Sequence, residues 1–406
     1  MVSAAVVVAI AVALAPPALP KPAAAPKLPP PPGAAPSAGL SRTQADVVVK
    51  AALSSIRKSQ RADRAAELKA GVIPASGMKM RIWAREFGRM AGDELRPLWI
   101  SMHGGGGAPA PVNDAQWENQ KRLYSPPEGV YVAPRAPTNE WNLWHQGHVD
   151  ALFDRLIENL VMCERVDPDR VYLMGYSAGG DGVYQLAPRM ADRFAAAAMM
   201  AGHPNEAVPD GLRNLPFSIQ MGALDGAFDR NLVAASWGER LAALQRADPG
   251  GYVHDVQVRP GKGHWMDGQD ASAIPWMAKY VRDPRPRRIV WVQDDVVEPR
   301  FYWLAVDRPQ AGQRIVCERE GQEIRILEAP PGIGLTVRLD DEMADLDQDV
   351  RITFAGAELF RGRAPRSKAT VERVLRERCD PKSAFTAEVE VRIPEAAAAP
   401  PVTTPR

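Results

Sequence analysis

The stretch "RVYLMGYSAGGDGVYQLAP" (170–188) has the pattern of a strand that turns sharply into a helix. Its centre, Gly175-x-Ser177-x-Gly179, fits the nucleophile elbow, a tight turn that lifts a serine hydroxyl clear of the backbone. The turn crowds its flanks, so small residues are needed on both sides. Glycine is common in this chain, and a chance match has odds on the order of one in ten. The interpretation of Ser177 therefore depends on the neighbouring segments.

Around this stretch, short apolar runs alternate with helical stretches. We expect helices at 148–166, 180–190 and 229–247, and a further helix, or two short ones, at 41–70 that stops at Gly71. This alternation predicts an α/β fold with a mainly parallel sheet covered on both faces. Ligands of such sheets bind beyond the carboxyl ends of the strands. The expected strands are 78–86, 96–102, 129–134, 170–175, 194–202, 217–222 and 252–258.

The composition and the hydrophobic pattern of the chain change after residue 283. Pro- and Arg-rich residues are followed by short strand-like runs and one helix (368–378), which predicts a smaller, antiparallel, sandwich-like β domain. The predicted organisation is a signal-like segment with a Pro/Ala-rich linker, an N-terminal helical segment, an α/β domain, a β-rich domain and a disordered tail. Their boundaries are 1–40, 41–71, 72–282, 283–394 and 395–406.

Composition excludes some classes of function. Lys and Arg number 50 against 49 Asp and Glu, so the chain has no basic field that would hold a nucleic acid. No cluster of Cys or His has the spacing of a zinc site, and we expect neither a metal nor an organic cofactor.

Cys163 lies in an apolar helical run, as a buried small residue would. Cys317 and Cys379 could pair in an exported protein, although pairing cannot be read from sequence.

The N-terminus carries an apolar run from Val2 to Ala15. The run is short for a membrane span but suits the core of a signal peptide, so we expect an exported protein without a stable span in its mature form. No Lys or Arg precedes the run, which is unusual for a signal peptide. An uncleaved anchor or a disordered Ala-rich tail are the alternatives.

Chemically capable residues follow several of the expected strands. The strand at 96–102 ends in His103 and a glycine run, 104–107, whose backbone N–H groups can point at one place without side chains in the way. Acyl transfer needs this arrangement to stabilise an oxyanion. A phosphate loop would require Gly-Lys-Ser/Thr after the turn, whereas Ala108-Pro109 follows here. We expect Gly104, Gly105 and the Ala178 N–H to form an oxyanion hole, and His103 to be structural.

A base and an acid follow in the order that the nucleophile requires. His264 lies in the loop after the strand at 252–258, and either Asp225 or Asp229 follows the strand at 217–222. His264 would take the serine proton and return it to the leaving group, while the aspartate fixes the imidazole tautomer. Asp229 begins a helical stretch and is expected to cap it, which favours Asp225 as the acid. Asp181, in the first turn after the elbow, suits the helix dipole.

The segment 78–282, about half the chain, resembles secreted α/β-hydrolases of the esterase and polyhydroxyalkanoate-depolymerase-like type. The resemblance rests on "HGGGG", "APRAPTNEWNLWHQ", "DPDRVYLMGYSAGG", "MGALD" and "GKGHW" in this order. It implies a serine hydrolase with Ser177, Asp225 and His264 as its triad. Every proposed catalytic residue precedes Asp283, so we expect a chain ending there to fold and to remain active.

Aromatic and histidine residues near these loops are candidates for contact with substrate. Trp141, Trp144 and His145 follow the strand at 129–134 and form either an aromatic wall of the site or a hydrophobic cluster before the next helix. His145 and His148 have HxxH spacing but no third ligand nearby, which disfavours a metal site. The further candidates are Tyr176, His203 and Trp265.

The sequence favours hydrolysis of a small or polymeric ester through an acyl-serine intermediate. A peptidase of the prolyl-oligopeptidase type is an alternative, but only about 70 residues precede the first expected strand, too few for the propeller of such enzymes. The other alternative is a non-catalytic protein that binds a polymer or partner through its β domain.

Overall fold

The computed structural model describes residues 39–395, except 90, 91 and 93. The tail (396–406) and nearly all of the predicted signal-like segment and linker (1–40) lie outside the described residues. In the described part, helix α1 (Arg42–Ala70) confirms the predicted N-terminal helix. Ser41 and Gln44 form a capping box at its start, and Gly71 ends it in the left-handed conformation.

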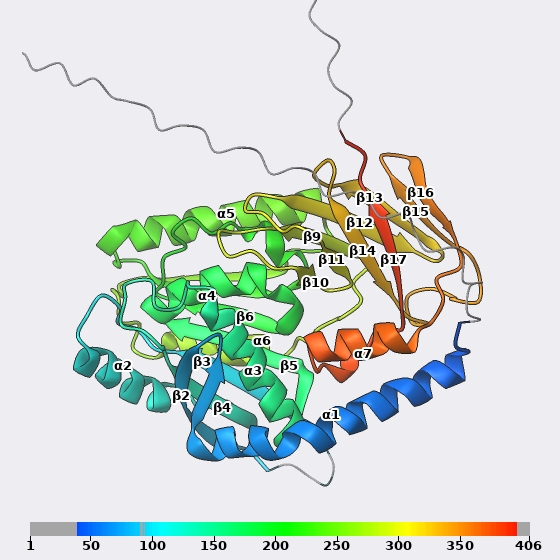
Figure 1. The fold of residues 1–406 in the computed structure, drawn as a ribbon. Coiled ribbons are helices and arrows are strands. Elements are labelled where there is room, and N and C mark those ends of the chain that lie inside the picture. Colours follow the sequence, from blue (N-terminus) through cyan, green and yellow to red (C-terminus); the bar gives the residue numbers. More distant parts are fainter. Residues whose placement is uncertain (1–38, 90–91, 93, 396–406) are drawn as a thin grey trace, which may run out of the picture. The chain divides into compact units, whose positions relative to one another are not determined.

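The larger part of the fold is an eight-stranded sheet in the order β1-β2-β4-β3-β5-β6-β7-β8 (Figure 1). Strands β1 and β2 pair antiparallel, as do β2 and β4, and all other neighbours are parallel. Every predicted strand of this region is present, and β1 is an addition that the sequence did not reveal. The strands are β1 (Val72–Ala75), β2 (Met78–Phe87), β3 (Arg96–Met102), β4 (Gly129–Arg135), β5 (Val166–Tyr176), β6 (Ala196–Met200), β7 (Phe217–Gly222) and β8 (His254–Arg259).

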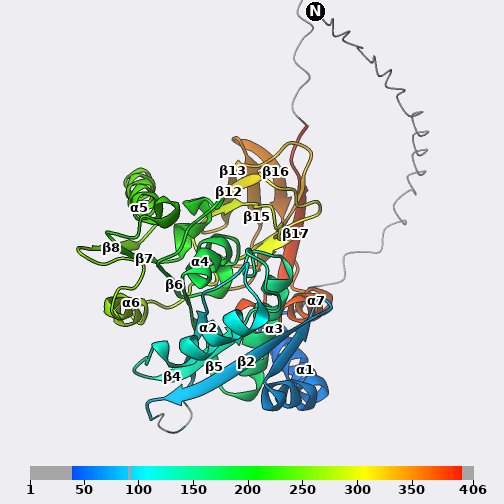
Figure 2. The same cartoon turned by 90° about the vertical axis from the view of Figure 1, so that its left-hand side faces the viewer.

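Helices cover both faces of this sheet. Along β3, Leu98 and Ile100 face one apolar core, which holds residues of α3, α4 and α5, while Trp99 faces a second core with residues of α2 and α6. This alternation follows from the period of two along a strand. Figure 2 shows β8 and α5 at one end of the sheet and β2 with α1 at the other. The helices are α2 (Ala110–Leu123), α3 (His148–Cys163), α4 (Ala178–Arg189), α5 (Arg230–Ala247) and α6 (Ala273–Met277), and the 3-10 helices are η1 (Ala191–Arg193), η2 (Pro209–Asn214), η3 (Ala227–Asp229) and η4 (Gln269–Ser272).

The C-terminal strands form two smaller sheets, with orders β10-β11-β14-β17 and β16-β15-β13-β12-β9. The first is antiparallel throughout, but β13 and β15 of the second pair in parallel, which corrects the expectation of antiparallel pairing. The reason is that β14, between them in the chain, crosses to the other sheet. The elements are β9 (Arg288–Val292), β10 (Arg300–Phe301), β11 (Leu304–Val306), β12 (Arg314–Glu320), β13 (Glu323–Glu328), β14 (Gly334–Leu339), β15 (Val350–Phe354), β16 (Ala357–Gly362), α7 (Lys368–Glu377), η5 (Pro381–Ser383) and β17 (Ala387–Arg392).

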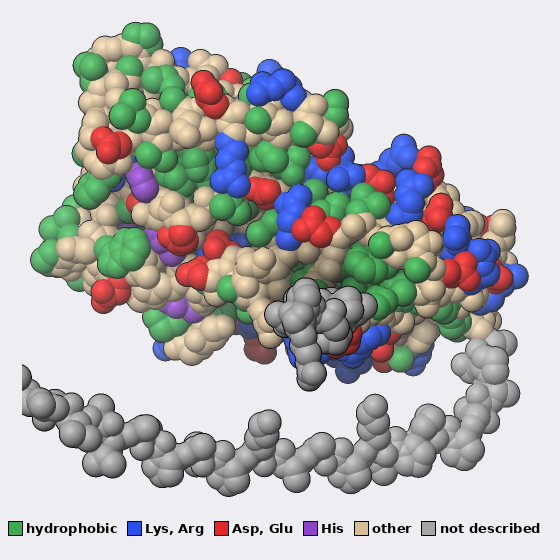
Figure 3. All heavy atoms as spheres, turned by 90° about the horizontal axis from the view of Figure 1, so that it is seen from above, with side chains coloured by type: hydrophobic (Ala, Val, Ile, Leu, Met, Phe, Trp, Pro, Cys, Tyr) green, Lys and Arg blue, Asp and Glu red, His purple; other side chains and the backbone are tan. Residues whose placement is uncertain are grey.

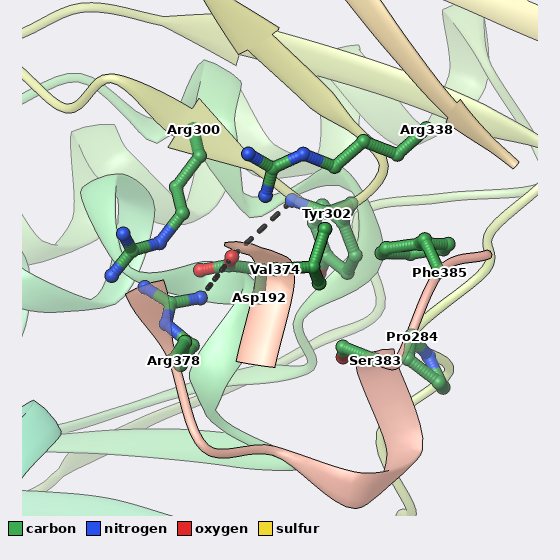
Figure 4. A pocket seen from close by; sticks show the side chains of 9 residues that line it. All are labelled: Asp192, Pro284, Arg300, Tyr302, Arg338, Val374, Arg378, Ser383 and Phe385. Atoms are coloured by element: carbon green, nitrogen blue, oxygen red, sulfur yellow. Dashed lines mark hydrogen bonds and ion pairs between the residues drawn. The ribbon is translucent and has the colours of Figure 1, made fainter. Parts of the chain in front are cut away.

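Buried charges join the C-terminal strands to the rest of the fold. Asp192 of η1 accepts hydrogen bonds from Arg378 Nη1 at 2.5 Å and from the backbone N–H of Tyr302 at 3.2 Å (Figure 4). A cavity of about 20 Å³ lies among these residues, room for about one water molecule. Arg282 Nη1 lies 2.8 Å from Asp380 Oδ2, and both side chains are almost fully buried. The apolar core is likewise continuous from the large sheet to the C-terminal strands.

The structure confirms the predicted α/β class, with a mainly parallel sheet and an additional β-rich part. All three cysteines are free thiols, so the possible pairing of Cys317 with Cys379 does not occur. Among the described residues, no helix has both the length and the hydropathy needed to span a bilayer.

Candidate active site

Ser177 occupies the turn between β5 and α4 with φ 59° and ψ −124°, a conformation that non-glycine residues rarely adopt. The flanking glycines explain how the turn closes. A β-carbon on Gly175 would lie 2.2 Å from the carbonyl oxygen of Gly179, and one on Gly179 would lie 2.2 Å from that of Met102. No other residue type fits at either position. The local sequence therefore dictates the strained turn that presents the serine.

Three side chains that are far apart in the sequence meet at this turn. His264 Nε2 lies 3.0 Å from Ser177 Oγ, and His264 Nδ1 lies 2.7 Å from Asp225 Oδ2. The carboxylate of Asp225 is only 2% exposed, whereas the imidazole is 43% exposed. A buried carboxylate on Nδ1 holds the proton there and leaves Nε2 free to accept the serine proton.

Asp229, the other candidate acid, is the N-cap residue of α5, but its side chain makes no capping hydrogen bond. It adopts the left-handed conformation, with φ 54°, and the predicted cap is therefore wrong. Asp225 is the aspartate that reaches His264, because its loop is fixed on both sides. The Asp225 N–H donates to the Gly222 carbonyl, and the Asp225 carbonyl accepts from the Asn231 N–H, each at 3.1 Å.

The glycine run after β3 lies beside the serine. Gly104 and Gly105 line the same cleft as Ser177, and a β-carbon on Gly104 would lie 3.0 Å from Ser177 Cβ. Ala178 is the first residue of α4, where the backbone N–H has no acceptor within the helix. The predicted oxyanion donors thus lie on the two segments that flank the Ser177 hydroxyl.

Two polar side chains fix the glycine run. His103 is fully buried, with Nδ1 at 2.5 Å from the Gly104 carbonyl and Nε2 accepting the Ala136 N–H at 3.1 Å, so the Nδ1 proton donates to Gly104. Burial lowers the pKa of His103 to about 4, which keeps the ring neutral. Asn113 of α2 accepts the Gly106 N–H and donates to the Ala108 carbonyl, both at 2.8 Å. The structural role expected for His103 agrees with these contacts, while the role of Asn113 was missed.

A cleft of about 660 Å³ opens in front of Ser177, a size typical of small-molecule sites. One wall is α2, which contributes an apolar, amide and cationic lining that the sequence analysis did not identify. The only early signals were Pro111 in its first turn and the run of helix-forming residues behind it. The lining residues from α2 are Val112, Gln116, Asn119, Gln120, Arg122 and Leu123.

The residues expected to contact substrate divide into three groups: those that line the cleft, those that are buried, and those that lie outside the cleft. Tyr176 and Trp265 line the cleft, although the Tyr176 hydroxyl is engaged: it donates to the His264 carbonyl at 2.6 Å and accepts the Met266 N–H at 3.2 Å. Trp144 is fully buried and donates to the His103 carbonyl, so its expected contact with substrate is wrong; it belongs to the core.

His145 is only 6% exposed, and burial lowers its pKa to about 4, so its expected contact with substrate is also corrected. Trp141 and His203 form the third group. Trp141 is exposed beside the glycine run, and His203 accepts the Asn205 N–H in the loop after β6, but neither lines this cleft. Asp181 holds that loop by accepting the His203 N–H at 2.6 Å.

Exposed apolar side chains surround the site. Six of the large ones lie on the segments that follow β3, β4, β7 and β8, which is the side of the sheet where Ser177 is presented. Figure 3 shows histidine side chains near one edge of the molecule, with hydrophobic and acidic side chains beside them. The six residues are Val112, Trp141, Leu224, Phe228, Leu232 and Trp265.

His145 and His148 have no third metal ligand beside them, and the described residues contain no group of three His, Cys, Asp or Glu side chains that could hold a metal ion.

Comparison with known proteins gives partial matches. No protein-family model matches the chain. The curated protein named "Putative esterase NocK", from Nocardia uniformis subsp. tsuyamanensis, is 33% identical over 132 residues. That match covers 29% of this chain and 37% of NocK, so the chain spans little more than a third of the length of this relative.

Solved structures with similarity to the chain include a thermostable esterase, at 16% identity and a TM-score of 0.39. The match covers 52% of this chain and 61% of that one. Another is LpqC, a poly(3-hydroxybutyrate) depolymerase from Bordetella parapertussis, at 22% identity and a TM-score of 0.36. Here 50% of this chain and 89% of the other are covered.

Proposed function

We propose that the protein is a serine hydrolase that cleaves carboxylic esters through an acyl-serine intermediate. The observation that carries the proposal is the hydrogen-bonded series from Ser177 Oγ to His264 Nε2 and from His264 Nδ1 to Asp225, at 3.0 and 2.7 Å. A serine on a strained elbow, a base within reach of it and a buried acid behind the base are the parts that nucleophilic acyl transfer requires. The name of NocK, the partial relative, indicates the same class.

In the proposed first half-reaction, Ser177 Oγ attacks the ester carbonyl carbon while its proton passes to His264 Nε2. The carbonyl oxygen becomes an oxyanion that accepts hydrogen bonds from the N–H groups of Ala178 and Gly105. The bond to the alcohol oxygen then breaks, and the alcohol leaves with the proton from His264. In the second half-reaction, water attacks the acyl carbon and gives one proton to His264 Nε2. The bond between the acyl carbon and Ser177 Oγ then breaks, Oγ takes the proton back from His264, and the acid leaves.

A peptidase remains the second candidate within the same chemistry, because the same three side chains can cleave amides. The two are separated with matched substrates: 4-nitrophenyl esters and aminoacyl 4-nitroanilides that share an acyl group. We expect turnover of the esters and little or none of the anilides. Ser177→Ala should lower ester turnover by up to about 10⁶-fold, to the level that oxyanion binding alone supports.

Ester turnover that persists in Ser177→Ala would refute the nucleophile. Efficient anilide turnover that depends on Ser177 would instead favour the peptidase. If the protein turned over neither substrate class, a binding role would replace the enzymatic one. The folded state of each variant is checked by thermal melting, and we expect it to be kept because the elbow conformation is set by its glycines.

A further inference from the structure

The cleft in front of Ser177 has an uneven distribution of charge. Its twelve lining residues include no Asp or Glu, and apart from the proposed catalytic His264 the one ionisable group of basic character is Arg122. The Arg122 guanidinium is exposed and forms no ion pair with any other described residue. The nearest acidic residue on its own helix, Glu118, pairs instead with Lys121 Nζ at 2.6 Å.

The position of Arg122 follows from the geometry of α2. Val112, Gln116, Asn119 and Leu123 are spaced three or four residues apart and form one face of the helix, toward the cleft. Gln116 lies at the glycine run, since a β-carbon on Gly105 would be 3.6 Å from Gln116 Cγ.

Arg122 comes six residues later, about 9 Å farther along the helix axis. The wall of the cleft thus runs from an apolar residue and amides near the proposed oxyanion hole to Arg122 and Leu123 in the last turn of α2.

We propose that this cleft selects esters that carry a carboxylate, and that Arg122 binds it about 9 Å along α2 from the oxyanion loop. The inference rests on the proposed ester hydrolysis and names its substrate class. A guanidinium is always charged and offers paired N–H donors that match the two oxygens of a carboxylate. A cleft without acidic groups gives such an anion no repulsive neighbour among its lining residues.

The test uses two substrates of equal length: the 4-nitrophenyl monoester of suberic acid and its analogue with a terminal carboxamide. The amide has the shape of the carboxylate without its charge. A second pair carries the same two groups on the alcohol side of an acetate ester, so that either orientation in the cleft is detected. We expect kcat/KM to be about 10-fold higher for the charged member of at least one pair, and the preference to shrink with added salt.

Variants of the full-length chain assign the preference to Arg122. Arg122→Gln should lower kcat/KM for the charged member to that of the uncharged member, Arg122→Lys should keep part of the preference, and Arg122→Glu should reverse it. The matched control is Arg246→Gln on α5, an exposed arginine that also forms no ion pair with the described residues and lies outside the cleft; it should behave as the wild type does.

The outcomes separate this inference from the proposed function. Equal turnover of both members of both pairs, or a preference that survives Arg122→Gln, would overturn the inference while Ser177-dependent hydrolysis stands. Hydrolysis that continues in Ser177→Ala, or no hydrolysis of any of the four esters, would overturn the proposed function itself.

Discussion

Asp225 and Asp229 lie in the same loop after β7, yet only Asp225 reaches His264 Nδ1. Asp225→Asn should lower kcat by about 10⁴-fold, because an amide favours the wrong imidazole tautomer, with little change in melting temperature. Asp229→Asn removes the same charge four residues away, and it should change stability by less than about 0.5 kcal/mol and leave kcat intact. Ester turnover and thermal melts of both variants test this pair. A large loss of activity at Asp229 would show that the acid is misassigned.

The protonation of His103, which holds the glycine run, makes the stability of the protein depend on pH. Its pKa is about 4 in the folded protein because of burial, and an unfolded histidine titrates near 6.5. As the pH falls below 6.5, the unfolded state binds the proton first, so the stability present above that pH is lost progressively down to about pH 4. The loss from this residue should reach about 2 kcal/mol at pH 5.

Urea unfolding at pH 7 and pH 5 measures this effect. His103→Gln should be less stable than the wild type at pH 7 but should lose about 2 kcal/mol less between the two values. His145→Gln provides an independent repeat, because burial also lowers the pKa of His145 to about 4. An equal loss in wild type and both variants would contradict the assignment.

Among the residues that the structure brings together around Ser177, those with a sequence signature could be predicted. Gly175, Ser177 and His264 are predictable because a strained turn and a loop after a strand require particular residue types. Trp144 was misplaced because position after a strand does not tell whether a side chain points to solvent or to the core. Asn113 has no local signature at all, because its two hydrogen bonds go to a loop that only the folded chain brings beside it.

At the scale of elements, Asn113 makes α2 a support of the proposed oxyanion loop. Asn113→Ala would leave the Gly106 N–H without its acceptor, which should cost about 1–3 kcal/mol of stability. The loosened loop should lower kcat by about 10- to 100-fold with a smaller change in KM. Asn113→Asp keeps the acceptor and should recover part of kcat. The control is Asn119→Ala, on the same helix and in the cleft but without a bond to the loop; an equal loss of kcat there would argue against the positioning role.

The strands of the large sheet were predictable because buried parallel strands form near-continuous apolar runs. Helix α2 was missed because its stretch contains few apolar residues and is bordered by glycines and prolines. Strand β9 directly follows Pro- and Arg-rich residues, which obscure its pattern, and β1 has only four residues. The parallel pairing of β13 with β15 depends on where β14 crosses between sheets, which no local pattern encodes.

At the scale of the whole molecule, the part of the chain up to Asp283 depends on the C-terminal strands. Removing them would leave Asp192 without Arg378, its ion-pair partner, and without the Tyr302 N–H. Arg193 and Arg282 would lose Asp380 and keep only Asp154 and Asp169, respectively. An unpaired buried charge costs about 3–5 kcal/mol, against a typical total stability of about 5–15 kcal/mol. Contrary to the expectation from sequence, we therefore predict that a chain ending near Asp283 does not fold.

We expect a chain ending at Asp283 to be insoluble or to lack a cooperative melt. In the full-length chain, Asp380→Ala should lower the melting temperature far more than Glu358→Ala, which breaks exposed ion pairs of β16. A soluble, active protein ending at Asp283 would show that the buried junction is dispensable.

The central claim is that Ser177 is a nucleophile activated by His264 and Asp225. Its most direct test is reaction of the full-length protein with a fluorophosphonate, followed by intact-mass measurement and mapping of the labelled peptide. We expect one adduct per chain, located on Ser177, that is absent from Ser177→Ala and forms far more slowly in His264→Ala. An unlabelled wild-type protein, or an adduct that persists in Ser177→Ala, would contradict it.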